Sequence, residues 1–183
     1  MDYNKKIDAI TIQFQEMFSE VSYETLNKKP NEKQWSISQN IEHLMKFNQS
    51  YFPIFTTIEK GKLSIPLIGN FRFYANYIGG TILKSVHPNN SKKIKTSPTW
   101  RPIKADGDKQ ILDNFVVHQE TLKNHITKME KWIKRNIVIY SPVSKALVYT
   151  LRTALEIIIT HEERHLNQAK KVLDTIVKRE ASN

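Results

Sequence analysis

Residues 155–176 read LEIIITHEERHLNQAKKVLDTI, and the spacing of the apolar residues in this stretch predicts a long helix with one buried side. We expect the helix to follow Ser141–Pro142 and to run to about Lys178. The apolar residues of the buried side are Leu147, Leu151, Leu155, Ile158, Leu166, Val172 and Ile176. A long helix that is apolar along one side is typical of a helical bundle.

Three further segments have the same periodicity, and each is bounded by a residue that ends or caps a helix. They are Asn4–Asn27, a segment from Ser36 or Ser38 to Gly61, and Asp108–Lys134. Pro30 cannot continue the first helix, and Pro53 is expected to kink the second. Either serine can cap the start of the second helix through its hydroxyl group.

The connection between the second and third helices is unusually long. It runs from Gly61 to Gly107, with a short helix expected at Asn70–Ile78 and a turn at Gly79–Gly80. A crossover of this kind allows two consecutive helices of a bundle to lie parallel. We therefore predict an all-α fold, a four-helix bundle with a long connection between helices two and three, formed as one domain by residues 1–183.

The composition narrows the classes of function. The chain has no cysteine, which excludes disulfides, a thiolate zinc site and a cysteine nucleophile. It has no signal peptide at its start and no stretch long and apolar enough to span a bilayer, so we expect a cytoplasmic protein with no membrane partner. The net charge is +10, with the densest basic stretch at Ser91–Lys104. Because no nucleic-acid-binding motif accompanies this charge, we favour a solvated basic surface over a nucleic-acid-binding module.

His161 and His165 are the sharpest chemical feature of the sequence. They are four residues apart on the long helix, so their imidazoles lie on one face and can reach the same ion. Ala154, Ile158 and Val172 share that side of the helix, so both rings are expected to point into the core. Burial favours the neutral imidazole, which is the form that binds metal.

A metal held by two ligands needs a third, and His43 in the second helix is the best candidate. Three neutral histidines leave a fourth position for water or substrate, which is the pattern of a catalytic site. His118 and His125 on the third helix are alternatives to His43, although a role at the core edge or the surface is favoured for both. We expect His87, in the long connection, to be solvated.

The same residues also match the H-E-x-x-H motif of metalloproteases, in which Glu162 would be the general base. The extended form of that motif requires glycine where Gln168 stands and a third histidine where Lys171 stands. Only 18 residues follow His165, and the glutamate among them, Glu180, lies close to the end of the chain. The sequence therefore disfavours a metalloprotease.

Two blocks around these histidines resemble the DinB/YfiT superfamily of metal-binding bundles. One is WSISQNIEHL at Trp35–Leu44, similar to the W-S-x-x-x-x-x-x-H-L start of helix two in that family. The other is HEERHLNQ at His161–Gln168, similar to its H-x-x-x-H-x-x-Q stretch. The resemblance implies a bundle whose three histidines, His43, His161 and His165, bind a divalent ion, typically zinc or nickel.

The resemblance also implies a range of activities and an assembly. Some members transfer the low-molecular-weight thiols bacillithiol or mycothiol to electrophiles, or isomerise maleylpyruvate with mycothiol, and others are described as hydrolases. A metal-dependent thiol S-transferase or hydrolase acting on a small-molecule substrate is therefore our first functional hypothesis. A metal-binding or sensor bundle without catalysis is the alternative. Members often dimerise, which leads us to expect a homodimer.

A catalytic site of this kind needs groups around the ligands. Asn40 and Gln168, each about one turn from a ligand, are candidates for orienting ligands or substrate. Glu162 or Glu42 would accept a proton, with solvated surface as the simpler reading of both. The basic connection would form a lid that attracts the carboxylates of a thiol, through Tyr74, Tyr77, Trp100 and Arg101.

Overall fold

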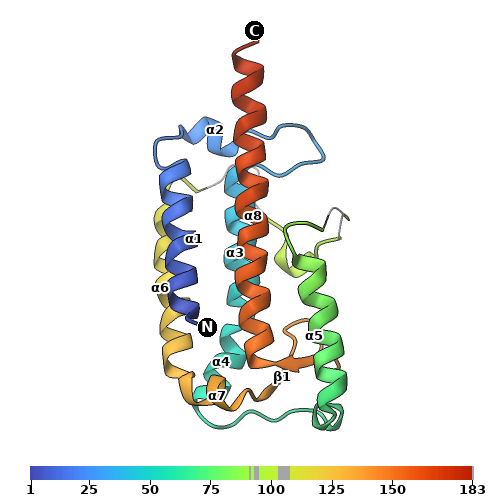
Figure 1. Ribbon diagram of the computed structural model, residues 1–183. Coiled ribbons are helices and arrows are strands. Elements are labelled where there is room, and N and C mark those ends of the chain that lie inside the picture. Colours follow the sequence, from blue (N-terminus) through green and yellow to red (C-terminus); the bar gives the residue numbers. More distant parts are fainter. Residues whose placement is uncertain (91, 93–94, 103–107, 183) are drawn as a thin grey trace.

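The computed structural model describes residues 1–90, 92, 95–102 and 108–182, and most of them are α-helical (Figure 1). The elements in chain order are α1 (Tyr3–Phe18), α2 (Tyr23–Asn27), α3 (Ile37–Gln49), α4 (Phe52–Glu59), the 3-10 helix η1 (Leu67–Asn70), α5 (Arg72–Val86), the 3-10 helix η2 (Pro98–Trp100), α6 (Ile111–Lys128), α7 (Glu130–Arg135), β1 (Val138–Tyr140), β2 (Val148–Thr150) and α8 (Leu151–Glu180). None of the described helices combines the length and the apolarity needed to cross a membrane.

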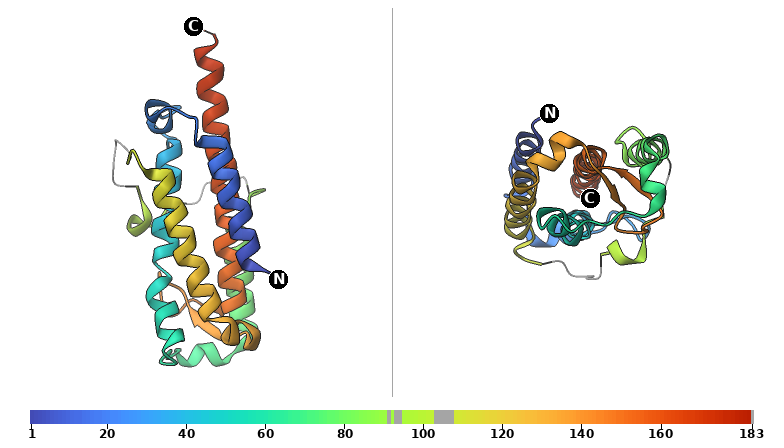
Figure 2. Two further views of the ribbon diagram at one scale, coloured as in Figure 1. Left: turned by 90° about the vertical axis from the view of Figure 1, so that its left-hand side faces the viewer. Right: turned by 90° about the horizontal axis from the view of Figure 1, so that it is seen from below.

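The long helices lie side by side around one apolar core. α1 and α3 each contact both α6 and α8. In Figure 1, α3 and α6 run from top to bottom while α1 and α8 run from bottom to top, so the long connection does join two parallel helices. The view from below in Figure 2 shows α5 on the outer side of α8, away from α1 and α6. α5 packs against α8 and β2, so this part of the connection is an integral layer of the structure.

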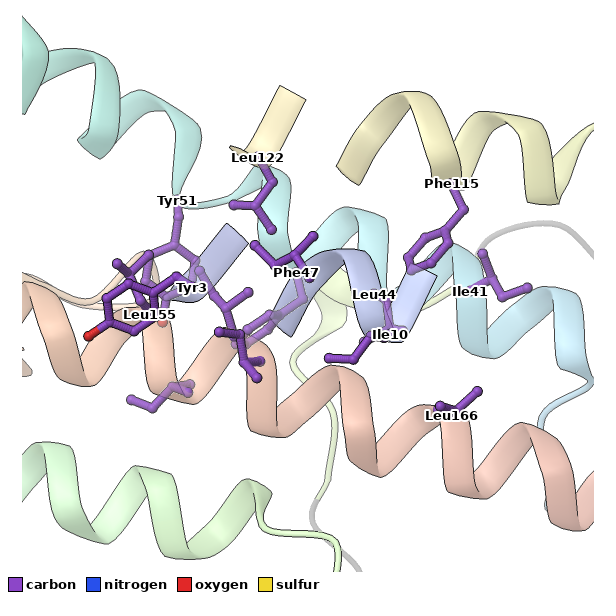
Figure 3. Close-up of a cluster of buried hydrophobic side chains, with 14 of the residues drawn as sticks. Tyr3, Ile10, Ile41, Leu44, Phe47, Tyr51, Phe115, Leu122, Leu155 and Leu166 are labelled. Atoms are coloured by element: carbon purple, nitrogen blue, oxygen red, sulfur yellow. The ribbon is translucent and has the colours of Figure 1, made fainter. Parts of the chain in front are cut away.

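The core is made from the apolar stripes predicted for these helices. Figure 3 shows Ile10 of α1, Ile41 and Leu44 of α3, Phe115 of α6 and Leu166 of α8 directed into one interior. All five side chains are buried. Burial of a large apolar side chain contributes roughly 1.5–3 kcal/mol, so this shared core is the main source of stability.

The start and end of the second predicted helix follow from specific residues. Ser36, and not Ser38, caps α3: its hydroxyl accepts a hydrogen bond from the backbone of Gln39, whose side chain bonds back to the backbone of Ser36. The second predicted helix is divided in two instead of only kinked at Pro53: α3 ends at Gln49 and α4 begins at Phe52, with the proline in its first turn. Gly61 follows with a positive φ of 66°, which a glycine adopts without strain.

The first and third expected helices are also each divided in two. The segment Asn4–Asn27 was predicted to be continuous, but α1 ends at Phe18 and α2 begins at Tyr23. Ser22 causes the new start, because its hydroxyl accepts a hydrogen bond from the backbone N–H of Thr25. The segment Asp108–Lys134 is likewise interrupted at Met129, between α6 and α7.

A β-hairpin precedes α8 where the sequence predicted helix. β1 pairs with β2 in antiparallel register, with Ile139 opposite Tyr149. Ser141–Pro142 lies in the turn of this hairpin, and the helix begins only at Leu151, after its N-cap residue Thr150. The prediction that Leu147 lies on the helix was therefore wrong. The strands have three residues each, too few for an alternating pattern to stand out.

The short helix predicted at Asn70–Ile78 is longer than expected. α5 continues to Val86, and Gly79–Gly80 lies inside it instead of forming a turn. A Cβ atom on Gly79 would lie 2.7 Å from Cγ2 of Thr153 on α8, whereas one on Gly80 would meet nothing within 4 Å. Gly79 therefore allows the close approach of two helices. In the sequence alone, a glycine with this role looks the same as a glycine in a turn.

Candidate metal centre

Three histidines meet between α3 and α8. His43 lies on α3, and His161 and His165 lie one turn apart on α8. The Nε2 atom of His161 is 3.3 Å from Nε2 of His43 and 3.1 Å from Nε2 of His165. One nitrogen from each ring lies within 4.8 Å of the other two, and all three side chains are buried. The structure therefore brings together the three ligands predicted from the sequence.

Hydrogen bonds to the outer ring nitrogens orient two of these rings. Nδ1 of His43 donates to the carbonyl oxygen of Trp100 at 2.8 Å, and Nδ1 of His165 donates to Oδ1 of Asn40 at 2.8 Å. The Asn40 side chain is itself fixed, because its amide group donates to the carbonyl oxygen of Ser36. With the proton on Nδ1, each ring presents the lone pair of Nε2 to the centre of the cluster.

Electrostatics keep the three rings neutral. Burial lowers the pKa of His43, and it lowers the pKa values of His161 and His165 well below the usual value of 6.5. The mutual proximity of the rings lowers the pKa values of His161 and His165 further, because a positive charge on one ring opposes a charge on the next. Neutral imidazole is the form that coordinates metal ions.

The donor set fits a divalent ion. Nε2 of His43 and Nε2 of His165 each direct a lone pair into the cluster, because the protons of these rings are on Nδ1. Only Nε2 of His161 can therefore carry a proton, and it can donate to one of these two atoms at a time. A cation satisfies all three lone pairs at once. Nitrogen ligands about 2.0–2.1 Å from a tetrahedral ion lie roughly 3.3 Å apart, close to the distances of 3.1 and 3.3 Å found here.

Aromatic side chains surround the cluster. The ring of Trp35 lies 4.9 Å from that of His43 and stacks on that of His165 at 6.0 Å. Phe47 lies 4.2 Å from the ring of His161, and Trp100 packs edge-on against Phe47. These side chains limit the access of water to the histidines, which strengthens electrostatic interactions within the site.

A sequence model of the DinB superfamily matches residues 8–169, which include all three histidines. The chain belongs to the DinB superfamily. Comparison with curated proteins and with solved structures gave no match. The resemblance noted at Trp35–Leu44 and His161–Gln168 is therefore confirmed at the level of the family. Membership in the DinB superfamily and the buried histidine cluster are together compatible with a metal-binding enzyme.

Of the residues predicted to assist the ligands, only some contact the histidine cluster of this DinB-superfamily protein. Asn40 is a direct hydrogen-bond partner of His165, as its position suggested. Gln168 is half-buried one turn beyond His165, without a described hydrogen bond to the cluster. Glu42 forms an ion pair of 2.7 Å with Lys46.

The simpler interpretation, which placed Glu162 on the solvated surface, is wrong. Glu162 is fully buried, and its carboxylate oxygens accept hydrogen bonds from Asn48 of α3 at 2.7 Å and Gln119 of α6 at 3.0 Å. Burial raises the pKa of Glu162 to about 7, against the lowering effect of the two amides. Because both oxygens are held by amides away from the histidines, the metalloprotease interpretation of the motif has no geometric support.

Of the four residues predicted to form a lid, two lie near the histidines and two do not. Trp100 and the backbone of Arg101 lie beside the histidines, since the Trp100 carbonyl bonds His43 and the Arg101 carbonyl accepts from Lys46 at 3.0 Å. Tyr74 instead bonds the carbonyl of Ala146 in the hairpin turn, and Tyr77 is 70% exposed on α5. These two tyrosines face elsewhere because α5 is a packed helix.

The remaining histidines do not join the cluster. His118 is buried and stacks on Phe52, and burial lowers its pKa to about 4. His125 contacts Glu59 of α4, with 2.6 Å between Nδ1 and a carboxylate oxygen. His87 is exposed, as predicted. In the described part of the chain, His43, His161 and His165 are the group of side chains with metal-binding geometry.

Two contacts at the site were not predicted, because both involve backbone carbonyl groups. One is the Trp100 carbonyl that orients His43. The other involves Arg164, which lies between the two histidines of α8 and donates to the carbonyls of His87, Asn90 and Lys92. Arg164 thereby attaches the long connection to the helix that carries the cluster. Side-chain identity gives no sign of such partners.

Proposed function

We propose that this protein is a metal-dependent enzyme built on a four-helix bundle, in which His43, His161 and His165 bind one zinc or nickel ion. We further propose that it transfers a low-molecular-weight thiol to an electrophilic small molecule. The observation that carries the proposal is the convergence of three neutral Nε2 atoms at 3.1 and 3.3 Å. Membership in the DinB superfamily supports it.

A divalent ion in such a site supplies Lewis-acid chemistry, lowering the pKa of a coordinated thiol or water. Three protein nitrogens leave one tetrahedral position for the substrate. The Trp100 carbonyl and Asn40 keep His43 and His165 in the tautomer that directs Nε2 inward. These partners fix the ligands before the metal arrives, so little ordering entropy is lost on binding.

Other residues shape the approach to the site. Lys46 bridges α3 and the segment after η2, because its ammonium group donates to the Arg101 carbonyl and pairs with Glu42. It therefore holds the Trp100 carbonyl near His43. The side chain of Arg101 is exposed at the same place. A positive edge of this kind attracts the carboxylates of a small thiol.

The arrangement favours thiol transfer over hydrolysis. A hydrolase normally uses a protein base that takes a proton from the attacking water. Glu162, the base suggested by the sequence motif, has both oxygens occupied by Asn48 and Gln119. Thiols are far more acidic than water, with a pKa of about 8.5, and so need less help from a protein base.

Metal analysis tests the first half of the proposal. We expect about one zinc or nickel ion per chain in the untagged wild-type protein, and loss of that ion in His43→Ala and in His161→Ala. His87→Ala is the matched control, since His87 is exposed and outside the cluster. A wild-type protein that takes up neither zinc nor nickel would refute the metal site.

Turnover tests the second half. The loaded protein is mixed with bacillithiol, mycothiol or cysteine and a bimane electrophile, and consumption of the thiol is followed. Consumption of the thiol that is lost in His43→Ala supports a metal-dependent thiol transferase. Stoichiometric metal with no turnover of any thiol or of model esters would instead identify a metal-binding or sensor protein.

A further inference from the structure

Almost the whole net charge of this protein comes from one segment. Between Glu59 and Asp106 the sequence contains nine Lys and Arg residues and no Asp or Glu, against a net charge of +10 for the entire chain. Lys60, Lys62 and Arg72 lie at the start of this segment, and all three are exposed. The path from α4 through η1 to the start of α5 crosses one end of the molecule, the lower end in Figure 1, next to α7.

The same end carries an unusual number of exposed apolar side chains, on η1 and the first turns of α5. Leu67 is 84% exposed, Phe73 76%, Tyr77 70%, Phe71 57% and Ile68 38%. Phe73 and Tyr77 are four residues apart, so they share one face of α5. Large side chains present roughly 150–250 Å² each when fully exposed. The five together expose apolar surface on the order of 600 Å², comparable to the largest patch on a typical monomer.

A hollow of about 420 Å³ lies at this end and combines apolar walls with two arginines. Its walls include Ile58, Leu63, Ile65 and Trp132, with Arg72 and Arg135 beside them. Among the described residues no carboxylate lies within ion-pair distance of either guanidinium group. The hollow therefore offers two uncompensated positive charges above apolar surface. Phosphate groups are the usual partners of paired arginines.

We infer that this end of the protein docks on the surface of a membrane that contains anionic phospholipid. Leu67, Phe71 and Phe73 enter the interface between headgroups and acyl chains, and Arg72 and Arg135 bind lipid phosphates. Apolar side chains combined with a basic surface are the features by which proteins lie on anionic bilayers without spanning them. The sequence-based expectation of no membrane partner rested on the absence of a spanning segment, and the basic charge was interpreted as a solvated surface. The exposed apolar side chains beside that charge were not part of the expectation.

The charges and residue types also decide against two other occupants. In a symmetric dimer through this patch, Lys60, Lys62, Arg72 and Arg135 of one copy would face the same residues of the other, and like charges would repel. In a nucleic-acid complex the exposed aromatic side chains could stack on bases, but Leu67 and Ile68 would gain little, since stacking requires aromatic or guanidinium groups. An anionic bilayer satisfies both the apolar and the basic side chains.

Flotation with lipid vesicles tests the inference. We expect full-length protein to float with vesicles containing about 30% phosphatidylserine and not with pure phosphatidylcholine. Arg72→Glu with Arg135→Glu should weaken binding at least twentyfold, at about fivefold for each positive charge lost. Leu67→Ser with Phe73→Ser should weaken it roughly tenfold for each side chain no longer inserted.

Matched controls lie at the opposite end of the molecule. Lys171→Glu with Lys178→Glu makes the same change in net charge on exposed positions of α8, and Val177→Ser removes an exposed apolar side chain there. These variants should bind vesicles within about twofold of wild type. Unchanged circular dichroism and metal content in every variant separate loss of docking from unfolding, and keep the result independent of the histidine site.

Four results would overturn the inference. The first is no flotation with anionic vesicles, and the second is an equal loss of binding in the control variants. The third is a wild-type dimer that Leu67→Ser with Phe73→Ser converts to monomer. The fourth is binding to a short DNA duplex that depends on Arg72 and Arg135 as strongly as vesicle binding does. The last two would assign the surface to a second copy of the chain or to nucleic acid.

Discussion

Replacing Glu162 by glutamine should remove the loss of stability that the metal-free protein undergoes as the pH rises toward neutral. Burial raises the pKa of this carboxyl group from 4.5 to about 7, which corresponds to about 3 kcal/mol. The folded protein therefore holds the proton more tightly than the unfolded chain does. The contribution of Glu162 to stability is fully present below pH 4.5 and is lost as the pH rises to about 7. Glu162→Gln has no proton to lose and should show no such decline.

The surroundings can accept the new amide group. Asn48 and Gln119 now donate to the two carboxylate oxygens, and their own amide oxygens, Oδ1 and Oε1, are buried without a hydrogen-bond partner in the described structure. If the side-chain amide of Gln119 turns over, its oxygen accepts from the new glutamine, whose own oxygen still accepts from Asn48. The amide nitrogen of Gln119 then takes the place of its oxygen, which has no described partner, so one buried donor is left without an acceptor, at a cost of about 1–3 kcal/mol that does not change with pH.

Chemical unfolding of wild type and Glu162→Gln at pH 5 and pH 8, with chelator present, measures the effect. We expect the stability of Glu162→Gln relative to wild type to rise by about 2–3 kcal/mol from pH 5 to pH 8. In thermal unfolding this rise corresponds to roughly 5–10 °C. Glu163→Gln, next to it and partly exposed, is the control and should change little. An equal effect at both pH values would refute the reasoning.

Two further predictions concern the ligand shell and the packing of α5. Asn40→Ala should reduce metal affinity about 10–100-fold in a chelator competition assay, because His165 loses the acceptor that orients it. Asn40→Asp should retain binding. Equal affinities of Asn40→Ala and wild type would contradict this role. Gly79→Ala should destabilise the protein by about 1–3 kcal/mol in chemical unfolding, because its Cβ would collide with Thr153. Gly80→Ala should instead stabilise it by up to about 1 kcal/mol. If both substitutions stabilise the protein, helix propensity alone determines the effect.

The parts of the fold that repeat along the sequence could be predicted from it. The apolar stripes identified α1, α3, α6 and α8, because a helix that buries one side must repeat apolar residues every three to four positions. The pair His161 and His165 followed from the same geometry, since their spacing alone places them on one face. His43 was preferred over His118 and His125 from its position in the second helix, and the family resemblance strengthened that choice. Spacing separated the three only weakly, because each lies on a helix that contributes to the core.

The rest depends on contacts between distant segments, which local sequence does not encode. The strands β1 and β2 have three residues each and exist because they pair with one another. Gly79 looks like a turn residue until Thr153 is seen against it. The Trp100 carbonyl reaches His43 across 57 positions of the chain, and every residue has a carbonyl group. Such features carry no compositional mark, so they require the structure.

The H-E-x-x-H spacing shows how one pattern can serve two purposes on a helix that is buried on more than one side. Successive residues on an α-helix are about 100° apart, so His161 and Glu162 point in different directions. His161 faces His43, while Glu162 faces Asn48 and Gln119, and both directions are buried. A surface helix would leave one of the two in solvent. In this protein the motif divides into a ligand pair and a separate polar core contact, and only the ligand pair belongs to the metal chemistry we propose.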